Sequence, residues 1–246
     1  DFFVQADGVN PLLDVTFDGQ HILDGDLVSS QPVIVASLRD GNKYLAMADT
    51  ATFIVSLVHP NLMVEKINWN DPRVLFTPAT PGNTKNQARL EFRPVFTTDG
   101  DYHLVVNGRD ASGNLSGLDY RISFQVITKS SLGRLLNYPN PFSSSTCFVY
   151  TMTGAETPAW FTLQIMTVSG RVVREVTAAE FGPLRVGTHQ SSFCWNGTDQ
   201  FGDQLANGVY LYRVMARKAD GQAFEFLSNQ SVDGFFKNGF GKMVLA

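Results

Sequence analysis

The side chains of this sequence that could perform chemistry are aspartates beside glycines, four histidines and two cysteines. Clustered aspartates could supply the oxygen ligands that Ca²⁺ prefers, but the twelve-residue alternation of an EF-hand loop is absent. Asp-Gly pairs are also ordinary turn chemistry, because both residue types tolerate tight backbone geometry. We therefore predict turns rather than a calcium site at Asp24, Asp26, Asp99, Asp101, Asp110, Asp199 and Asp203.

The histidines lack the short spacings of metal-binding motifs, since they are scattered over the chain as His21, His59, His103 and His189. The sequence also contains no Gly-rich phosphate loop that leads from a strand into a helix, and no Gly-x-Ser-x-Gly elbow. We therefore expect a chain that is not an enzyme and that holds no catalytic residue, metal or cofactor.

Cys147 and Cys194 both fall in expected strands of one domain. Two interpretations are open. They are either buried thiols that act as small hydrophobic residues, which we favour, or a disulfide formed in an oxidising compartment. A catalytic thiol is disfavoured, because neither cysteine has the neighbouring histidine or cation that lowers a thiol pKa.

Composition excludes two classes of protein. The 246 residues carry a net charge of −4, and only 17% of them are charged, so the basic surface that nucleic acids require is missing. No run of 18 apolar residues is present, so we expect no transmembrane segment. The first residues lack the regions of a signal peptide, and we expect the chain to be a piece of a longer protein.

Short apolar stretches separated by turn residues fill the first half of the chain. Alternating apolar and polar residues between Asp-Gly, Asn and Pro turns are typical of antiparallel strands, and no helical period of useful length interrupts them. The sequence therefore predicts an immunoglobulin-like antiparallel β-sandwich over residues 1–129, with strands at 12–17, 32–38, 52–58, 88–94, 102–107 and 120–126.

A second series of strands follows residues 130–136, a Ser- and Gly-containing stretch that we predict to be a linker. Two prolines then hold the backbone extended and remove sheet donors, which predicts a stiff start to a second domain at 137–246. The fold class is thus all-β, with two consecutive immunoglobulin-like antiparallel β-sandwiches. In the second domain we expect one helical turn at 178–181 and strands at 146–150, 161–168, 171–176, 190–195, 208–218, 223–227 and 242–245.

Four stretches of the second domain are distinctive: a Pro-Asn-Pro motif, a hairpin at 168–173, a strand that begins Gly-Val-Tyr, and a final Lys-Met-Val-Leu. Their residues include Pro139, Asn140, Pro141, Phe142, Gly208, Tyr210, Lys242, Met243, Val244 and Leu245. They resemble the C-terminal sorting domain of proteins exported by the type IX secretion system of Bacteroidota. Residues 195–212 are also similar to the immunoglobulin-like domain of flagellar hook-capping proteins.

Residues 164–171 together with 195–199 resemble the C-terminal region of PorU-like proteins, which are large surface proteins of the gingipain peptidase family. In the first domain, Asp18–Asp26 and Asp110–Asn114 resemble the sandwich that precedes the sorting domain in such proteins. The resemblance implies that any Cys/His catalytic pair of a parent cysteine peptidase lies outside this chain. Family sequences often finish with a basic residue, whereas this chain finishes with Ala246.

The resemblance implies a non-catalytic secretion and attachment region. Such a region directs a large parent polypeptide through the periplasm and the type IX translocon to the cell surface or the medium, by binding a PorV-like outer-membrane receptor. The residues expected to be recognised are Gly208, Tyr210, Lys242, Met243, Val244 and Leu245. A terminal strand can be recognised through its edge hydrogen bonds and alternate side chains, with Lys242 supplying a charge. Whether the domain is cleaved or retained stays open.

A surface adhesin or a carbohydrate-binding pair of sandwiches is the alternative, since one fold serves many functions. It would use exposed aromatic side chains, for which the candidates are Trp69, Trp160, Phe235, Phe236 and Phe240. We favour packing roles for these residues, and a core position for Trp195. Separately, Asp49-Thr50-Ala51 resembles the O-glycosylation motif of exported Bacteroidota proteins, which makes Thr50 a candidate acceptor.

Overall fold

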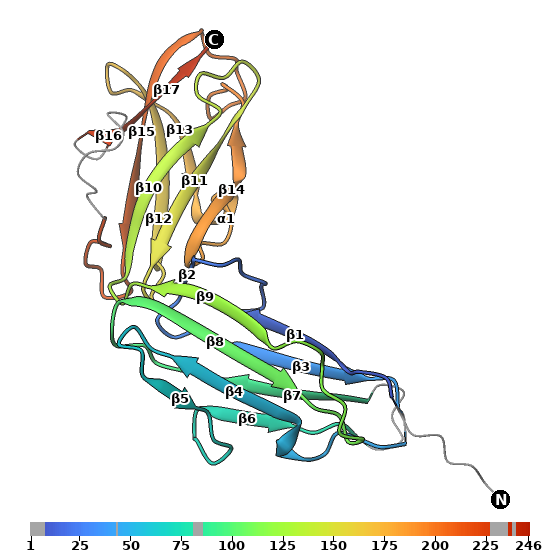
Figure 1. Cartoon of the computed structure of the whole chain (residues 1–246). Helices are drawn as coiled ribbons and strands as arrows, with labels where there is room; N and C mark the ends of the chain where they lie inside the picture. Colours follow the sequence, from blue (N-terminus) through green and yellow to red (C-terminus); the bar gives the residue numbers. More distant parts are fainter. Residues whose placement is uncertain (1–7, 43, 81–85, 227–235, 238–239) are drawn as a thin grey trace, which may run out of the picture. The chain divides into compact units, whose positions relative to one another are not determined.

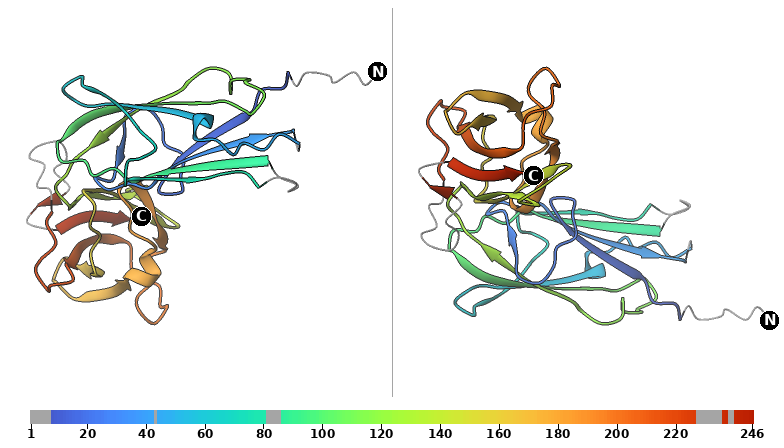
Figure 2. Two further views of the ribbon diagram at one scale, coloured as in Figure 1. Left: turned by 90° about the horizontal axis from the view of Figure 1, so that it is seen from below. Right: turned by 90° about the horizontal axis from the view of Figure 1, so that it is seen from above.

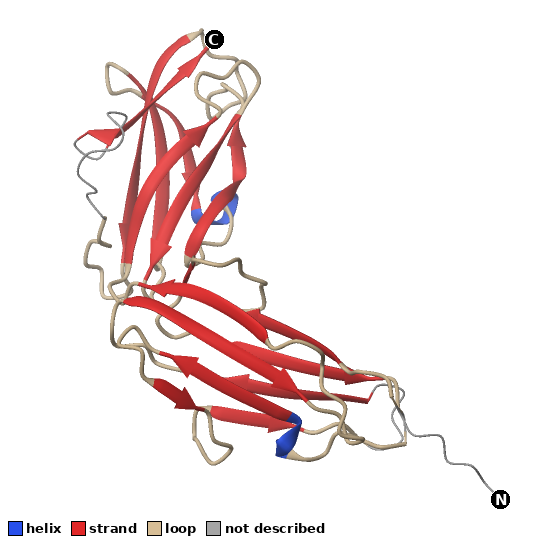
Figure 3. Ribbon diagram, in the orientation of Figure 1, coloured by secondary structure: helices blue, strands red, loops and turns tan. Residues whose placement is uncertain are grey.

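The computed structural model describes residues 8–42, 44–80, 86–226, 236–237 and 240–246. Strands and loops make up nearly all of this part of the chain, as Figures 1 and 3 show. The described helices are a 3₁₀ turn, Thr50–Thr52, and α1, Ala178–Phe181, which falls where the helical turn is predicted. The chain divides into two compact units, Asp1–Thr128 and Lys129–Ala246. The all-β fold class is therefore confirmed.

The first unit contains two sheets. One has the order β1–β3–β7–β6, with bounds Leu12–Phe17, Ile34–Asp40, Asn86–Phe92 and Val74–Thr77. The other has the order β2–β9–β8–β4–β5, with bounds Asp26–Val28, Tyr120–Val126, Gly100–Gly108, Phe53–Val58 and Val64–Lys66. All pairs are antiparallel except β2 with β9. The edge strands β5 and β6 were not predicted, because three or four residues are too few to show an alternation.

One hydrophobic cluster joins the two sheets of the first unit. Phe17 of β1 meets Phe124 of β9 edge to face, with ring centroids 5.2 Å apart. Phe96 packs against Phe124 and also against Tyr102 of β8, at 5.7 and 4.5 Å. Aromatic pairs at such distances stabilise a core beyond the area that they bury, so the sandwich is held together across its layers.

The second unit also has two sheets, which can be followed in Figure 2. The three-stranded sheet has the order β10–β11–β14, with bounds Ser131–Tyr138, Thr146–Thr153 and Gly187–Trp195. The five-stranded sheet has the order β13–β12–β15–β17–β16, with bounds Val172–Thr177, Trp160–Thr167, Gly208–Arg217, Phe240–Leu245 and Phe236–Lys237. One cluster with Phe148, Phe181, Trp195 and Tyr212 at its centre joins these sheets.

The linker predicted at 130–136 is wrong over most of its length, because Ser131–Tyr138 forms strand β10. Leu132 and Leu135 of this strand are buried in the core of the second unit. The pairing of β10 with β11 shifts register between Gly133 and Leu136. This irregularity breaks the two-residue alternation by which a strand is recognised in a sequence, and it explains why the strand was taken for a linker.

The strand predicted at 223–227 is not regular in the part that the structure describes, which ends at Phe226. Ala223 and Phe226 form only isolated bridges, to Arg217 and Leu132 respectively. Phe224 between them is buried. The alternation of this stretch therefore reflects one anchoring side chain between two bridges rather than a continuous ladder.

Cys147 and Cys194 form a disulfide that joins β11 to β14. The two residues are direct partners in the antiparallel register. Cys194 is exposed and Cys147 is half-buried, so the favoured interpretation as buried thiols is wrong. Because the bond closes a loop over a sequence separation of 47 residues, it restricts the unfolded chain of the second unit.

Replacing both cysteines, C147S with C194S, is expected to lower the free energy of unfolding of the second unit by about 2–4 kcal/mol. Thermal unfolding of the full chain, followed in both units, measures the effect. Reduction of the wild-type protein should give the same loss, while the transition of the first unit stays unchanged. Equal midpoints for the oxidised and reduced protein would contradict this expectation.

Candidate functional site

The Pro-Asn-Pro motif contacts the C-terminal strand directly. The Asn140 side-chain amide donates to the Lys242 carbonyl oxygen at 3.0 Å, and its oxygen accepts the Val244 N–H at 2.9 Å. The peptide bonds before both prolines of the motif are cis. One asparagine side chain thus replaces a neighbouring strand over two alternate residues of β17.

The backbone of Phe142 extends these contacts to the end of the chain. Its N–H donates to the Val244 carbonyl at 3.0 Å, and its carbonyl accepts the Ala246 N–H at 2.8 Å. We call these two bonds, with the two of Asn140, the Asn140 clasp. Because β15 pairs with the opposite edge of β17 as far as Leu245, both edges of the C-terminal strand are engaged from Lys242 to Leu245.

Phe142 also brings the clasp into contact with the core. Its side chain is 3% exposed and packs against Trp195, with ring centroids 5.6 Å apart. Trp195 in turn contacts Tyr210 edge to face at 5.2 Å. Three of the four stretches that carry the sorting-domain resemblance, together with the Trp195 stretch, therefore meet in one assembly. Trp195 itself is a core residue, as predicted.

Gly208 and Tyr210 have a structural role that recurs in the first unit. The Tyr210 hydroxyl donates to the Ala206 carbonyl at 2.7 Å, and the Tyr102 hydroxyl donates to the Thr98 carbonyl at 2.9 Å. Each tyrosine is the third residue of its strand and follows a glycine of positive φ at the first position. This is the tyrosine corner of immunoglobulin-like sandwiches, so the fold alone accounts for both residues.

The outward and inward residues of β17 differ in their exposure to solvent. Met243 and Leu245 are buried in the core, whereas Lys242 is exposed and Val244 is half-buried. Of the residues expected to be recognised on this strand, only Lys242 and Val244 thus present side chains to solvent. The role of all of them in recognition stays a prediction.

Two of the aspartates beside glycines accept hydrogen bonds from residues distant in the sequence. Asp24 accepts from the N–H and hydroxyl of Ser123, and the backbone bond is the main reason that its pKa lies below the usual value. Asp99 accepts in the same way from Thr128, whose hydroxyl lowers its pKa. Within the described ranges, no group of three or more His, Cys, Asp or Glu residues is arranged to hold a metal ion. These residues act as turn and loop anchors.

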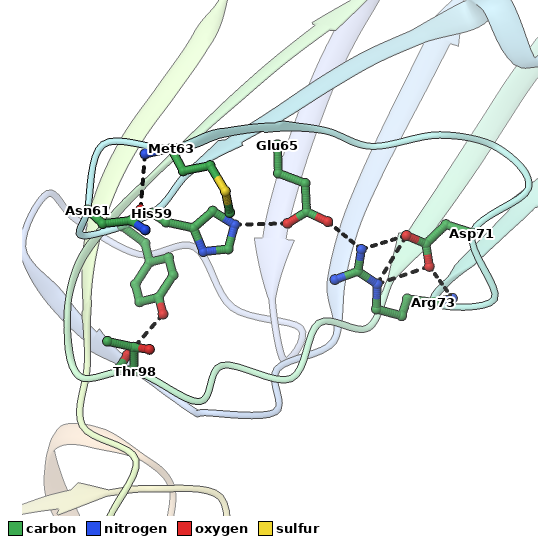
Figure 4. A network of polar contacts seen from close by, with 8 residues as sticks. His59, Asn61, Met63, Glu65, Asp71, Arg73 and Thr98 are labelled. Atoms are coloured by element: carbon green, nitrogen blue, oxygen red, sulfur yellow. Dashed lines mark hydrogen bonds and ion pairs between the residues drawn. The ribbon is translucent and has the colours of Figure 1, made fainter.

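A charged network that the sequence did not reveal lies at the β4–β5 hairpin of the first unit (Figure 4). Glu65 accepts from His59 at 2.9 Å and also from Arg73, whose guanidinium in addition forms a two-pronged contact with Asp71. Burial of Glu65 opposes its ionisation, but the bonds from Arg73 and His59 outweigh this and lower its pKa. The hydrogen bond from Arg73 likewise lowers the pKa of Asp71.

Three aromatic residues of the adhesin alternative can be placed in the described part of the chain. Trp69 packs on the core of the first unit and contacts Phe76 at 5.7 Å. Trp160 is 44% exposed, but the Arg217 guanidinium lies over its ring at 5.5 Å. Phe240 is half-buried, with the Arg213 guanidinium 5.9 Å from its ring centroid. Phe235 lies outside the described residues, and the side chain of Phe236 is not described.

The candidate glycosylation residue Thr50 begins the 3₁₀ turn and is half-buried. Asp49 caps this turn by accepting the Ala51 N–H at 3.0 Å, and the Thr50 hydroxyl donates to the same carboxylate at 3.3 Å. The motif is therefore a capped turn in the structure. Modification of Thr50 stays a prediction.

Fold and site together define an all-β protein of two immunoglobulin-like units. No protein-family model and no curated protein sequence matches the chain. Among solved structures, dimeric latent PorU from Porphyromonas gingivalis is similar at 17% identity and a TM-score of 0.38, over 98% of this chain and 20% of that chain. This chain thus spans about a fifth of that protein's length.

Two further structures are similar over nearly the whole chain. SGBP-B of the Bacteroides ovatus mixed-linkage glucan utilization locus, in complex with a mixed-linkage heptasaccharide, has 13% identity and a TM-score of 0.27, over 96% of this chain and 61% of that chain. The BSP domain of a biofilm associated protein has 7% identity and a TM-score of 0.25, over 97% and 52%. At these scores we assign no function from the similarities. In the described part of the chain, no helix has the length and apolar character to span a membrane.

Replacing Asn140 by alanine is expected to destabilise the second unit by about 1–2 kcal/mol, because two hydrogen bonds to β17 are lost. Urea unfolding of the full chain measures this change. The matched control is N207A, since Asn207 is exposed and immediately precedes β15. If N140A and N207A unfold at the same urea concentration, the two hydrogen bonds of the Asn140 side chain contribute nothing to stability.

The Arg73 network is expected to make the first unit less stable in acid. Because the folded-state pKa values of Glu65 and Asp71 lie below their unfolded values, the stabilisation is complete above the unfolded values and is lost as pH falls through the folded ones. R73M should cost about 1 kcal/mol at pH 7 and flatten this dependence. Urea unfolding between pH 7 and pH 3 measures this dependence, and the control is R89M, at an arginine that is more exposed than Arg73. Equal pH profiles for R73M and the wild type would refute the expectation.

Proposed function

We propose that this chain is the C-terminal secretion and attachment region of a larger protein exported by a type IX secretion system. In this proposal the second unit is the sorting domain, and a PorV-like outer-membrane receptor and the translocon are its partners. The first unit is a spacer between the sorting domain and the rest of the parent polypeptide. The protein passes through the periplasm and ends at the cell surface or in the medium.

The observation that supports this proposal most strongly is the Asn140 clasp. The clasp joins two of the stretches that resemble sorting domains. These stretches are distant in the sequence, since Asn140 and Lys242 are 102 positions apart. Since β17 pairs with β15 on one side and with the clasp on the other, the second unit is completed by its last residues.

The two units differ in the features that matter for this role. Both have the sandwich and the tyrosine corner, but the clasp joins two motifs of the second unit alone. We therefore assign recognition to the second unit, which begins at Lys129. Within the described residues, no specific observation favours the adhesin alternative, because Trp69 and Trp160 are engaged by Phe76 and Arg217.

The proposal is tested by fusing a fluorescent passenger ahead of residues 129–246 in a type IX-competent bacterium and in a secretion-null strain. We expect passenger at the surface or in the medium only in the competent strain, and its size then shows whether the domain is removed. The matched control is the passenger fused to residues 1–128, which has the same fold class and should stay in the periplasm. Periplasmic retention of both fusions in both strains would refute the address function.

A further inference from the structure

The outward face of the five-stranded sheet in the second unit carries a row of apolar residues. Antiparallel partners share a face of a sheet, and the registers align Val172 with Met166, Met166 with Leu211, and Val209 with Val244. Val172 and Val209 are 43% and 37% exposed, Leu211 and Val244 are half-buried, and Met166 is buried. The apolar side chains of four strands, β13, β12, β15 and β17, therefore adjoin one another. We call these five residues and Lys242 the β12–β17 face.

A polar row borders this face along the same strands. The Gln164 amide donates to Glu175 at 2.7 Å, and the Arg213 guanidinium donates to the Gln164 oxygen at 2.9 Å. Arg213 also lies over the ring of Phe240. A surface with an apolar centre and a polar border has the composition of a protein interface.

The charge of the face is positive, although the chain as a whole has a net charge of −4. Strands β12, β15 and β17 contain no Asp or Glu, and their outward positions include Arg213, Arg217 and Lys242. Strand β13 adds one carboxylate on the same side, Glu175, which accepts from Gln164. Lys242 is the register partner of Leu211 and so lies at the margin of the apolar residues. A partner with carboxylates around an apolar patch is complementary to this arrangement.

The edges of β17 are unsuited to strand addition. β15 occupies one edge, and the Asn140 clasp occupies the other from Lys242 to Ala246. A partner that added a strand there would have to displace these hydrogen bonds, and an unsatisfied buried donor or acceptor is costly. The sequence led us to expect recognition through edge hydrogen bonds, and the occupied edges disfavour it. The outward side chains of the strand are then the groups that a receptor can contact.

We propose that the β12–β17 face, rather than the strand edge, is the docking surface of the second unit for its receptor, a protein that presents an apolar patch bordered by carboxylates. This inference rests on the proposed function. Val172, Val209 and Val244 supply the apolar contact, and Lys242 supplies the charge that orients it. Gly208, Tyr210, Met243 and Leu245 act by shaping the sheet beneath.

The test measures binding of the full chain to the purified PorV-like receptor of a type IX-competent bacterium, held in detergent. V209D is expected to weaken binding about tenfold, as for a central contact of an interface, and K242E is expected to weaken it by reversing a charge at the margin. The matched control is V149D, because Val149 faces outward from β11 on the three-stranded sheet, and it should bind as the wild type does. Thermal unfolding checks that each variant is folded. If V209D does not fold, K242E, which changes an exposed residue, still tests the face.

The outcomes separate the docking surface from the function. Weakened binding of V209D or K242E with normal binding of V149D supports the face, and a smaller salt dependence in K242E supports the role of its charge. Unchanged binding of V209D and K242E overturns the face and leaves the function intact. A wild-type chain that neither binds the receptor nor exports a passenger overturns both. Self-association of the wild-type chain that V209D abolishes would assign the face to a second copy and also overturn the proposal.

Discussion

The second unit depends on the hydrogen bonding of its last strand. β17 receives β15 on one edge and the Asn140 clasp on the other, and its Met243 and Leu245 side chains are buried in the core. The contact between Asn140 and Lys242 spans 102 positions. Contacts this distant in sequence are made only after the entropy of closing a long loop has been offset. The pairing of β17 therefore carries the entropic cost of closing a long loop.

Close packing of β17 against β15 explains why glycine is required within β17. Gly241 is the register partner of Tyr212, and a Cβ atom at Gly241 would lie 2.0 Å from the tyrosine ring. Tyr212 is buried, and its hydroxyl donates to the Leu135 carbonyl of β10 at 3.1 Å. One aromatic side chain thus links β15, β17 and the opposite sheet, which ties the C-terminal strand to a strand that precedes it by about a hundred residues.

Local sequence patterns predicted many of the strands, but they did not predict features that depend on pairing between distant residues. Strands such as β1 and β7 were recognised because apolar and polar residues alternate in them. Strand β10 was missed because its pairing shifts register between Gly133 and Leu136. The stretches of the candidate site were selected by resemblance, but their meeting through Asn140 depends on distant pairing. Equally, the outward position of the cysteines and the alignment of Val172, Met166 and Leu211 follow from registers that no local pattern contains.

Edge and face recognition differ in what they demand of the folded domain. Adding a strand to β17 would exchange the four hydrogen bonds of the Asn140 clasp, each contributing about 1 kcal/mol, before any new contact could form. Natural sheets commonly protect their edges in this way, which prevents pairing with the wrong chain. Contact through the outward side chains of Val209 and Lys242 leaves the clasp intact. A signal that must stay folded while it is read is therefore better presented on a sheet face whose edges are already satisfied.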